Sequence, residues 1–279
     1  MTLITAFDPA WPGSVQASAW HTVVLAGDRQ SPDPVAQAAG TTCKAMAPVA
    51  GRPMLERVTD ALRASRLAAG TTLCGPGEDA IAASPQLSAG LSDGWLTWRQ
   101  PAATPSASVA GVLNDAETNP PLLVTTGDHA LLTPDMVAAF GAAITGHDWD
   151  AAVAVVPHGL VTARYPEARP TATRLRGGAL CGCNLFALKT DRSRYLVDLW
   201  AGLEQRRKHP WRTIAGTVGP RSLIDYALGR LSLHTVLERL SRRLGVRVGA
   251  VLLPYAAAGL DVDTVADWEL ADRIARGAA

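Results

Sequence analysis

Three aspartates stand where a metal-dependent reaction on phosphates would need them. Asp128 follows the apolar run 121–126 and is preceded by Gly127, whereas Asp261 and Asp263 lie near the C-terminus. A carboxylate at the tip of a buried strand can hold Mg²⁺ against a nucleotide phosphate. A turn or a helix cap explains Asp128 equally well when it is considered alone.

Asp261 and Asp263 are expected to project to the same face of a short strand, because side chains two residues apart do so. The next helix should be capped by Thr264, with Asp267 three residues later completing the cap. Capping leaves the two earlier carboxylates unexplained, and a cation would relieve their mutual repulsion. We therefore expect Asp128, Asp261 and Asp263 to be the ligands of a Mg²⁺ ion.

A turn and a lysine in the first fifth of the chain have the character of a phosphate site. The turn is Leu25-Ala26-Gly27-Asp28-Arg29, and Lys44 ends the loop that follows it. Glycine lets backbone N–H groups approach a phosphate, and a lysine adds a compact positive charge. A glycine after a strand is more often only a turn, and no Gly-Lys-Ser/Thr sequence makes this a Walker loop.

A cluster of basic residues, 206–212, follows a long predicted helix. Cations at a helix end commonly just match the helix dipole. In a chain with a net charge of only +1, such a cluster also suits the phosphate of an acceptor molecule. On that second interpretation Arg207 and Lys208 are acceptor-binding residues.

The elements that must position these residues alternate between strand and helix. Strands are predicted over 22–26, 71–74, 95–98, 121–126, 150–156, 184–188 and 247–253, and helices from 53, 106 and 134 and over 191–208, 220–244 and 265–275. We expect Ser106 to cap its helix. The pattern predicts an α/β fold, a three-layer αβα sandwich around a mostly parallel, mixed sheet. Residues 1–20 are expected to be an N-terminal extension of a single domain, 21–279.

Composition narrows the class of protein. The 279 residues are 48% hydrophobic and include 26 basic and 25 acidic side chains, so no overall field would gather nucleic acid or an anionic membrane. No apolar run is long enough to span a bilayer, and the N-terminus lacks the pattern of a secretory signal. Cys43, Cys74, Cys181 and Cys183 have no metal-ligand spacing and are expected to be free buried thiols in the cytoplasm.

Taken together, these motifs resemble the nucleotidyltransferases with a GT-A-type fold, and within them the MobA-like group. The resemblance spans residues 20 to 276 in the family's order. It rests on Leu25-Ala26-Gly27, on Lys44-Ala-Met-Ala-Pro-Val-Ala-Gly51-Arg-Pro53-Met54, on Gly127-Asp128, on Gly182-Cys-Asn184 and on Asp261-Val-Asp-Thr-Val-Ala-Asp267. Three departures stand out: Asp28 replaces the second glycine of the loop, the usual loop arginine is replaced within Gln30-Ser-Pro-Asp-Pro34, and the loop to Lys44 is longer than usual.

The resemblance implies a role for each motif. Lys44 and Asp128 would be catalytic, and Mg²⁺ would be held by Asp128 with Asp261 or Asp263. The nucleotide would contact residues of three segments, namely Leu25, Ala26, Gly27, Asp28 and Arg29, then Ser106 and Ser108, then Gly127. Gly182 and Asn184 would shape the acceptor pocket, with the nucleotide-binding half at about 21–145 and the acceptor half at about 146–279.

We therefore expect an enzyme that couples an NTP to a phosphorylated small molecule and releases pyrophosphate. The segment Pro105-Ser-Ala-Ser-Val-Ala-Gly111 resembles a helix start of a cytidylyltransferase, which slightly favours CTP. Two alternatives stay open: a GT-A-type glycosyltransferase and a nucleotide-binding regulatory protein with reduced catalysis, which Asp28 would favour. Neither nucleic acid nor a membrane is an expected partner, and a homodimer is left open.

Overall fold

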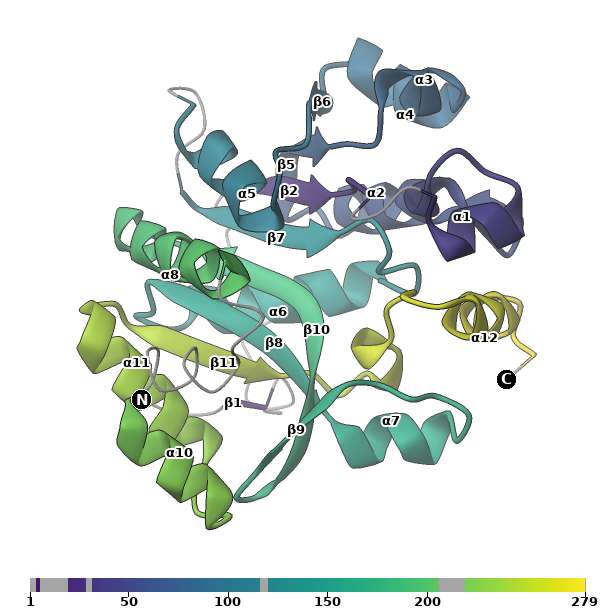
Figure 1. Ribbon diagram of the computed structural model, residues 1–279. Helices are drawn as coiled ribbons and strands as arrows, with labels where there is room; N and C mark the ends of the chain where they lie inside the picture. The colour runs from purple at the N-terminus through teal and green to yellow at the C-terminus, as the bar shows by residue number, and fades with distance from the viewer. Residues whose placement is uncertain (1–3, 6–19, 29–31, 116–119, 206–218, 279) are drawn as a thin grey trace.

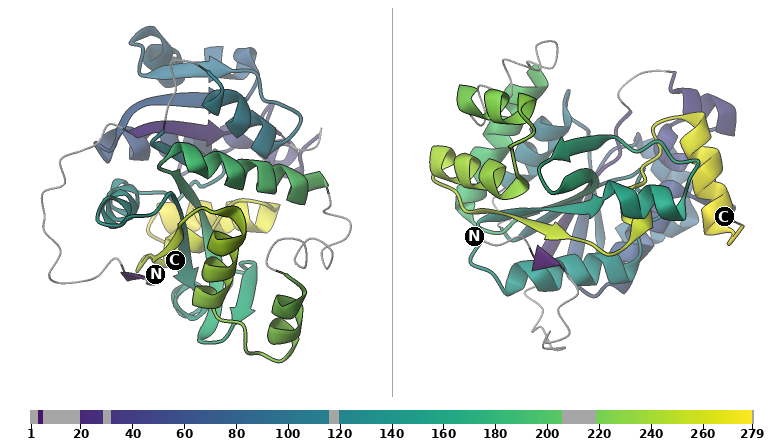
Figure 2. Two further views of the ribbon diagram at one scale, coloured as in Figure 1. Left: turned by 90° about the vertical axis from the view of Figure 1, so that its left-hand side faces the viewer. Right: turned by 90° about the horizontal axis from the view of Figure 1, so that it is seen from below.

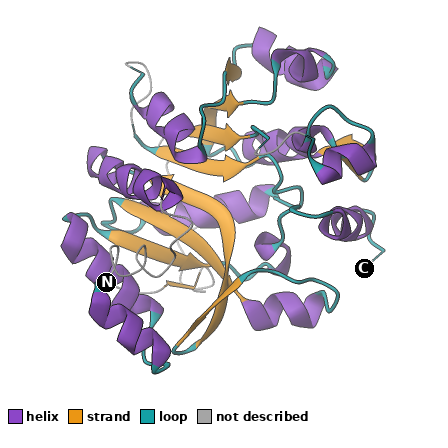
Figure 3. Ribbon diagram, viewed as in Figure 1, coloured by secondary structure: helices purple, strands orange, loops and turns teal. Residues whose placement is uncertain are grey.

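Every predicted strand run forms part of one mixed sheet. The computed structural model describes residues 4–5, 20–28, 32–115, 120–205 and 219–278. Within these ranges the sheet has nine strands, in the order β1-β11-β8-β10-β7-β2-β5-β6 with β9 paired to β10 (Figures 1 and 3). They are β1 (Ile4–Thr5), β2 (Trp20–Leu25), β5 (Ala68–Cys74), β6 (Leu96–Arg99), β7 (Leu122–Thr126), β8 (Ala151–Pro157), β9 (Ala172–Leu175), β10 (Gly178–Leu188) and β11 (Val248–Leu252). A small hairpin of β3 (Pro48–Val49) and β4 (Arg52–Pro53) stands apart.

One strand reverses the direction of an otherwise parallel sheet. β2 is parallel to β5 and β7, and β8 is parallel to β11, whereas β10 is antiparallel to both β7 and β8. The carboxyl ends of the parallel strands therefore meet at one edge, where ligands of such sheets bind. Because β10 runs the other way, its first half lies at that same edge, with Leu180 opposite Pro157.

Helices cover both faces of the sheet, as Figures 2 and 3 show. They are α1 (Pro34–Ala39), α2 (Met54–Ala64), α3 (Glu78–Ala82), α4 (Pro85–Ser92), α5 (Pro105–Leu113), α6 (Pro134–Thr145), α7 (His158–Arg164), α8 (Arg194–Gln205), α10 (Pro220–Ala227), α11 (Leu233–Leu244) and α12 (Val265–Ala275). Neighbouring residues of β2 point to opposite faces: Val24 packs with α2 and α6, and Val23 packs with α5 and α8. The three-layer αβα sandwich predicted from the sequence is confirmed.

A separate apolar cluster joins three distant segments beside the carboxyl edge. It brings together Val35 of α1, Ala130 after β7, and Val262 and Ala271 near the C-terminus. The indole of Trp268 donates to the carbonyl of Pro48 at 2.8 Å, which ties α12 to the small hairpin. This packing fixes the two loops that carry the predicted lysine and the late aspartates.

Several local predictions are wrong. Thr104, not Ser106, caps α5, because Pro105 takes the first helical position and the Thr104 hydroxyl accepts from the N–H of Ala107. The predicted helix 220–244 is two helices, separated at Gly229, whose φ is +64°. Residues 260–263 form no strand, although the Thr264–Asp267 capping box is present.

The state of the cysteines and the character of the helices agree with two predictions from the sequence, that the thiols are free and buried and that no segment spans a bilayer. All four cysteines are free and buried. Burial raises the pKa of the Cys74 thiol to about 11, which keeps that group protonated. Over the described ranges, no helix combines the length and the apolar character that crossing a membrane requires.

Two neighbouring loops at the carboxyl edge pack closely against Gly27. A Cβ placed on Gly27 would lie 2.9 Å from the Cβ of Pro101. A Cβ on Gly75, whose φ is +81°, would lie 2.9 Å from the backbone nitrogen of Gly27. Glycine at position 27 is thus required by packing, independently of any phosphate.

A buried carboxylate holds the opposite edge of the sheet together. Asp150, 2% exposed, accepts from the backbone N–H of Arg247 at 2.8 Å, from its guanidinium at 3.2 Å and from the Thr190 hydroxyl at 2.8 Å. Burial alone would raise the pKa of Asp150, but these hydrogen bonds outweigh it and lower the pKa.

Gly27→Ala should destabilise the fold by about 1–3 kcal/mol, because the new methyl group overlaps Pro101. The measurement is urea unfolding of a double-mutant cycle with Pro101→Gly, which removes the opposing Cβ. In the Pro101→Gly background the cost of Gly27→Ala should fall sharply. An unchanged cost there would show that Pro101 is not the constraint.

Asp150→Asn should lower the free energy of unfolding at pH 7 by about 2 kcal/mol, since hydrogen bonds to a buried charge are lost. The pKa of Asp150 is depressed in the folded state, so its stabilisation exists above the unfolded pKa of about 3.9 and fades below it. The difference from the wild type should therefore shrink in acid. Asp148→Asn is the matched control: this exposed carboxylate also pairs with Arg247, and its loss should cost under about 0.5 kcal/mol.

Candidate active site

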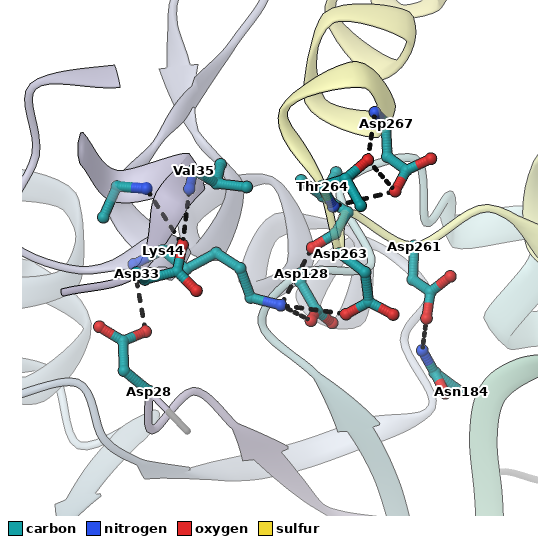
Figure 4. Close-up of polar contacts among 12 residues, drawn as sticks. Asp28, Asp33, Val35, Lys44, Asp128, Asn184, Asp261, Asp263, Thr264 and Asp267 are labelled. Atoms are coloured by element: carbon teal, nitrogen blue, oxygen red, sulfur yellow. Dashed lines mark hydrogen bonds and ion pairs between the residues drawn. The ribbon is translucent and has the colours of Figure 1, made fainter. Parts of the chain in front are cut away.

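The Lys44 ammonium lies among the predicted aspartates. Its Nζ is 2.5 Å from Asp128 Oδ2, 3.0 Å from the carbonyl of Val262 and 3.4 Å from Asp263 Oδ1 (Figure 4). The structure thus brings together three segments that are far apart in sequence.

Backbone contacts explain this convergence. Lys44 begins a short 3-10 helix, Lys44–Met46, and Asp128 follows the end of β7 in a tight turn. The N–H of Val262 donates to the carbonyl of Asp128 at 3.2 Å, and the N–H of Gly127 donates to Leu25 at 2.9 Å. The loops after β2 and β7 and the segment before α12 are therefore held against one another.

The electrostatics of the site favour a charged ion pair. The Lys44 and Asp128 side chains are 18% and 16% exposed. Burial would lower the pKa of Lys44, but the attraction and hydrogen bond of Asp128, followed by those of Asp263, outweigh burial and raise it. Lys44 is consequently an ammonium at neutral pH.

Asp261 lies beside this pair and is oriented by Asn184. The Asn184 amide donates to Asp261 Oδ2 at 3.0 Å (Figure 4). Asn184 has a φ of +47° and interrupts the pairing of β10 with β8, and asparagine tolerates this left-handed conformation. Burial first, then Asp263 and Asp128, raise the pKa of Asp261, while Asn184 opposes the shift. The predicted acceptor residue Asn184 therefore contacts a predicted metal ligand.

Asp28, which replaces the second glycine of the family's loop, contacts the residue at the far end of the same loop. Its Oδ1 accepts from the backbone N–H of Lys44 at 3.2 Å. Burial raises the pKa of Asp28, the hydrogen bond from Lys44 lowers it, and nearby Asp33 raises it further. Asp33 caps α1, which occupies part of the extended loop. The carboxylate at position 28 thus positions the backbone of Lys44.

The residues at this site fit Mg²⁺, which binds oxygen ligands and commonly needs only one or two carboxylates. Asp128 Oδ1 is buried and has no hydrogen-bond partner among the described residues. Asp261 and Asp263 add oxygen donors nearby. Within the same ranges, no three histidine, cysteine, aspartate or glutamate side chains are already arranged around a metal position. Lys44 supplies the positive charge among the carboxylates instead.

A cavity of about 590 Å³ opens next to the loop after β2. Of the predicted nucleotide-binding residues, it is lined by Leu25, Gly27, Asp28 and Ser108. The side chains of Ser106 and Ser108 are engaged within the chain: the Ser106 hydroxyl donates to Glu204, and the Ser108 hydroxyl accepts from the N–H of Ala102 at 2.9 Å.

Sequence reasoning missed Trp200 and Glu204, which line the cavity from α8. They stand four residues apart in a helix, so they lie on the same side of it. This spacing was visible in the sequence, but only the packing of α8 against α5 shows what that side faces (Figure 1).

The remaining predicted residues lie around the site or outside the described ranges. Ala26 is buried, and Gly127 packs against Ala26 and Ala45. Gly182 is the last regular pairing position of β10 before its irregularity. Arg29, Arg207 and Lys208 fall outside the residues that the structure describes.

The fold recurs in solved structures. A hypothetical transferase from Thermus thermophilus is 30% identical, with a TM-score of 0.72 over 90% of this chain and 99% of that one. CMP:2-keto-3-deoxy-manno-octonic acid synthetase complexed with CTP is 13% identical, with a TM-score of 0.54 over 94% and 100%. 4-Diphosphocytidyl-2C-methyl-D-erythritol synthase from Anaerococcus prevotii is 11% identical, with a TM-score of 0.53 over 92% and 98%.

The sequence matches a family model as well. Residues 22–244 match the MobA-like NTP transferase domain. No curated protein matches the chain. Since the matched residues make up most of the chain and include Lys44 and Asp128, the chain belongs to the MobA-like NTP transferase family and is a nucleotidyltransferase.

Proposed function

We propose that this nucleotidyltransferase transfers a nucleotidyl group from an NTP to a phosphorylated small molecule in a Mg²⁺-dependent reaction. The observation that carries the proposal is the Lys44 ammonium held between Asp128 and Asp263. In the reaction, an acceptor phosphate oxygen forms a bond to the α-phosphorus of the NTP. The bond from that phosphorus to the bridging oxygen breaks, and pyrophosphate leaves.

The chain's own groups would act mainly through charge and alignment, which dominate such transfers. Lys44 would bind the phosphate oxygens on which negative charge accumulates. Asp128, with Asp261 or Asp263, would hold Mg²⁺, which neutralises phosphate charge when bound. Asn184 would keep Asp261 in place, and residues 206–212 would serve the acceptor phosphate.

Nucleotide binding and acceptor binding are assigned to successive parts of the chain. We assign nucleotide binding mainly to about residues 21–145 and acceptor binding mainly to about 146–279, although α8 of the second half also lines the cavity beside the loop after β2. Two of the similar structures are named for cytidine compounds, but the serines that favoured CTP are both engaged within this chain. CTP stays the slightly favoured substrate in our proposal, on the resemblance of residues 105–111. Free buried thiols accord with the cytoplasmic location that we propose.

The direct test is pyrophosphate release from each of the four NTPs with a pool of phosphorylated acceptors, with and without Mg²⁺. A nucleotidyltransferase releases pyrophosphate only when an acceptor and Mg²⁺ are both supplied. A glycosyltransferase would instead release a nucleoside phosphate from a nucleotide sugar. A regulatory protein would bind an NTP without either product.

Asp128→Asn should reduce turnover by about 100-fold or more, because the isosteric amide removes the charge that Lys44 and a metal require. The melting temperature should fall only modestly, because Val262 and Asp263 still contact the Lys44 ammonium. Asp135→Asn is the matched control, since Asp135 is an exposed carboxylate in the first turn of α6. Near-normal turnover of Asp128→Asn at saturating Mg²⁺ would refute the assignment.

Lys44→Ala should lower turnover by about 100- to 1,000-fold, as loss of a group that stabilises transition-state charge does. The relative rates with the four NTPs should stay the same, because Lys44 would contact phosphate and not the base. Steady-state kinetics with each NTP measures both quantities. A changed NTP preference at an unchanged rate would contradict this role.

A further inference from the structure

The cavity beside the active site is bounded by three parts of the fold. Gly27 and Asp28 lie at one side, the segment 101–105 forms a second, and Trp200 and Glu204 of α8 form a third. Because Asp28 also contacts the backbone of Lys44, the cavity adjoins the proposed phosphate site. Its volume of about 590 Å³ is within the range of small-molecule sites.

The lining suits the uncharged part of a nucleotide. Among the described residues that line the cavity there is no lysine or arginine, whereas Asp28 and Glu204 are both present. These two carboxylates would repel triphosphate charge, whereas at Lys44 the ammonium and the Mg²⁺ that we propose would offset the charge of the neighbouring aspartates. The cavity also has an apolar and aromatic wall, formed by Leu25, Pro101 and the indole of Trp200. A nucleobase that stacks on this wall and is buried against it would bind more tightly.

The Glu204 carboxylate is held in a defined place. It accepts from the hydroxyl of Ser106 through Oε2, and from the backbone N–H of Ser106 at 3.4 Å through Oε1. Trp200, one turn earlier, packs in the apolar cluster between α5, α8 and the sheet and stacks with Phe186 at 6.0 Å. A carboxylate has about four acceptor positions, so Ser106 leaves part of this capacity for a ligand.

We propose that Glu204 determines base specificity by accepting a hydrogen bond from an exocyclic amino group. Cytosine, guanine and adenine carry such a group, whereas uracil, thymine and hypoxanthine present a carbonyl oxygen or a C–H instead. A carbonyl facing a fixed carboxylate brings two acceptors together and leaves both unpaired, which is strongly unfavourable in a buried site. This inference rests on the proposed nucleotide-binding function of the site.

The test measures binding of nucleosides, which lack phosphate and need no metal. Ligand-detected NMR titrations would compare cytidine with uridine, guanosine with inosine, and adenosine with inosine. The wild type should bind at least one amino nucleoside about tenfold more tightly than its partner lacking that group. The three pairs also identify which amino base fits.

Glu204→Gln should reduce that preference to within about threefold, because the amide can turn its own N–H₂ group towards a carbonyl. Ser106→Ala keeps the carboxylate but removes the hydroxyl that holds it, and should reduce the preference to a smaller degree. Trp200→Leu should weaken both members of a pair equally. Asp198→Asn, which removes an exposed carboxylate of the same helix outside the cavity lining, should change nothing.

Equal binding of both members of every pair by the wild type would overturn the proposal. An unchanged preference in Glu204→Gln, or no saturable binding of any nucleoside, would overturn it too. The outcome is separable from that of the proposed reaction. Nucleotidyl transfer at equal rates from both members of every pair, namely CTP and UTP, GTP and ITP, and ATP and ITP, would refute the role of Glu204 alone. A clear nucleoside preference without pyrophosphate release would refute only the catalysis.

Discussion

The ion pair between Lys44 and Asp128 is the interaction on which the site depends. The two residues are 84 positions apart, and the same ammonium also binds the carbonyl of Val262, 218 positions from Lys44. One positive charge therefore holds three loops at the edge of the sheet. It also balances carboxylates that would otherwise repel one another, since Asp128 and Asp263 both raise the pKa of Asp261.

The sheet explains why the loops can meet at all. Parallel strands deliver their following loops to one edge, which places Gly27 after β2 next to Asp128 after β7. The reversed strand β10 contributes from within the strand and not from a loop that follows it, because its first half and its irregular segment lie at this edge. Its irregular residue Asn184 thereby reaches Asp261. Asn184 thus orients a carboxylate that we propose as a metal ligand.

Two of the departures from the family's loop have structural explanations. Asp28 contributes an acceptor for the backbone of Lys44, and Asp33 caps the helix that fills the longer loop. The loop after β2 is also held by packing, because Pro101 lies close to Gly27. The site thus divides into the Lys44 ammonium with its aspartates and a cavity lined by acidic and apolar side chains, to which we assign the phosphates and the base of a nucleotide as a proposal.

The sequence alone determined the α/β class and put forward Lys44, Asp128, Asp261 and Asp263 as candidates for one site, and the structure places these four residues together. The class follows from β-branched apolar runs, which define strands, and Asp128 was indicated by its place after such a strand. Lys44 and the two late aspartates were indicated by their spacing and by the family resemblance. Only the tertiary structure decided what each of these residues contacts. The amide of Asn184 binds Asp261, the hydroxyl of Ser106 is taken by Glu204, and α8 faces the cavity. Such pairings join residues tens to hundreds of positions apart. They depend on which helices pack side by side on the sheet. The hydrophobic periodicity of a single segment does not specify that packing.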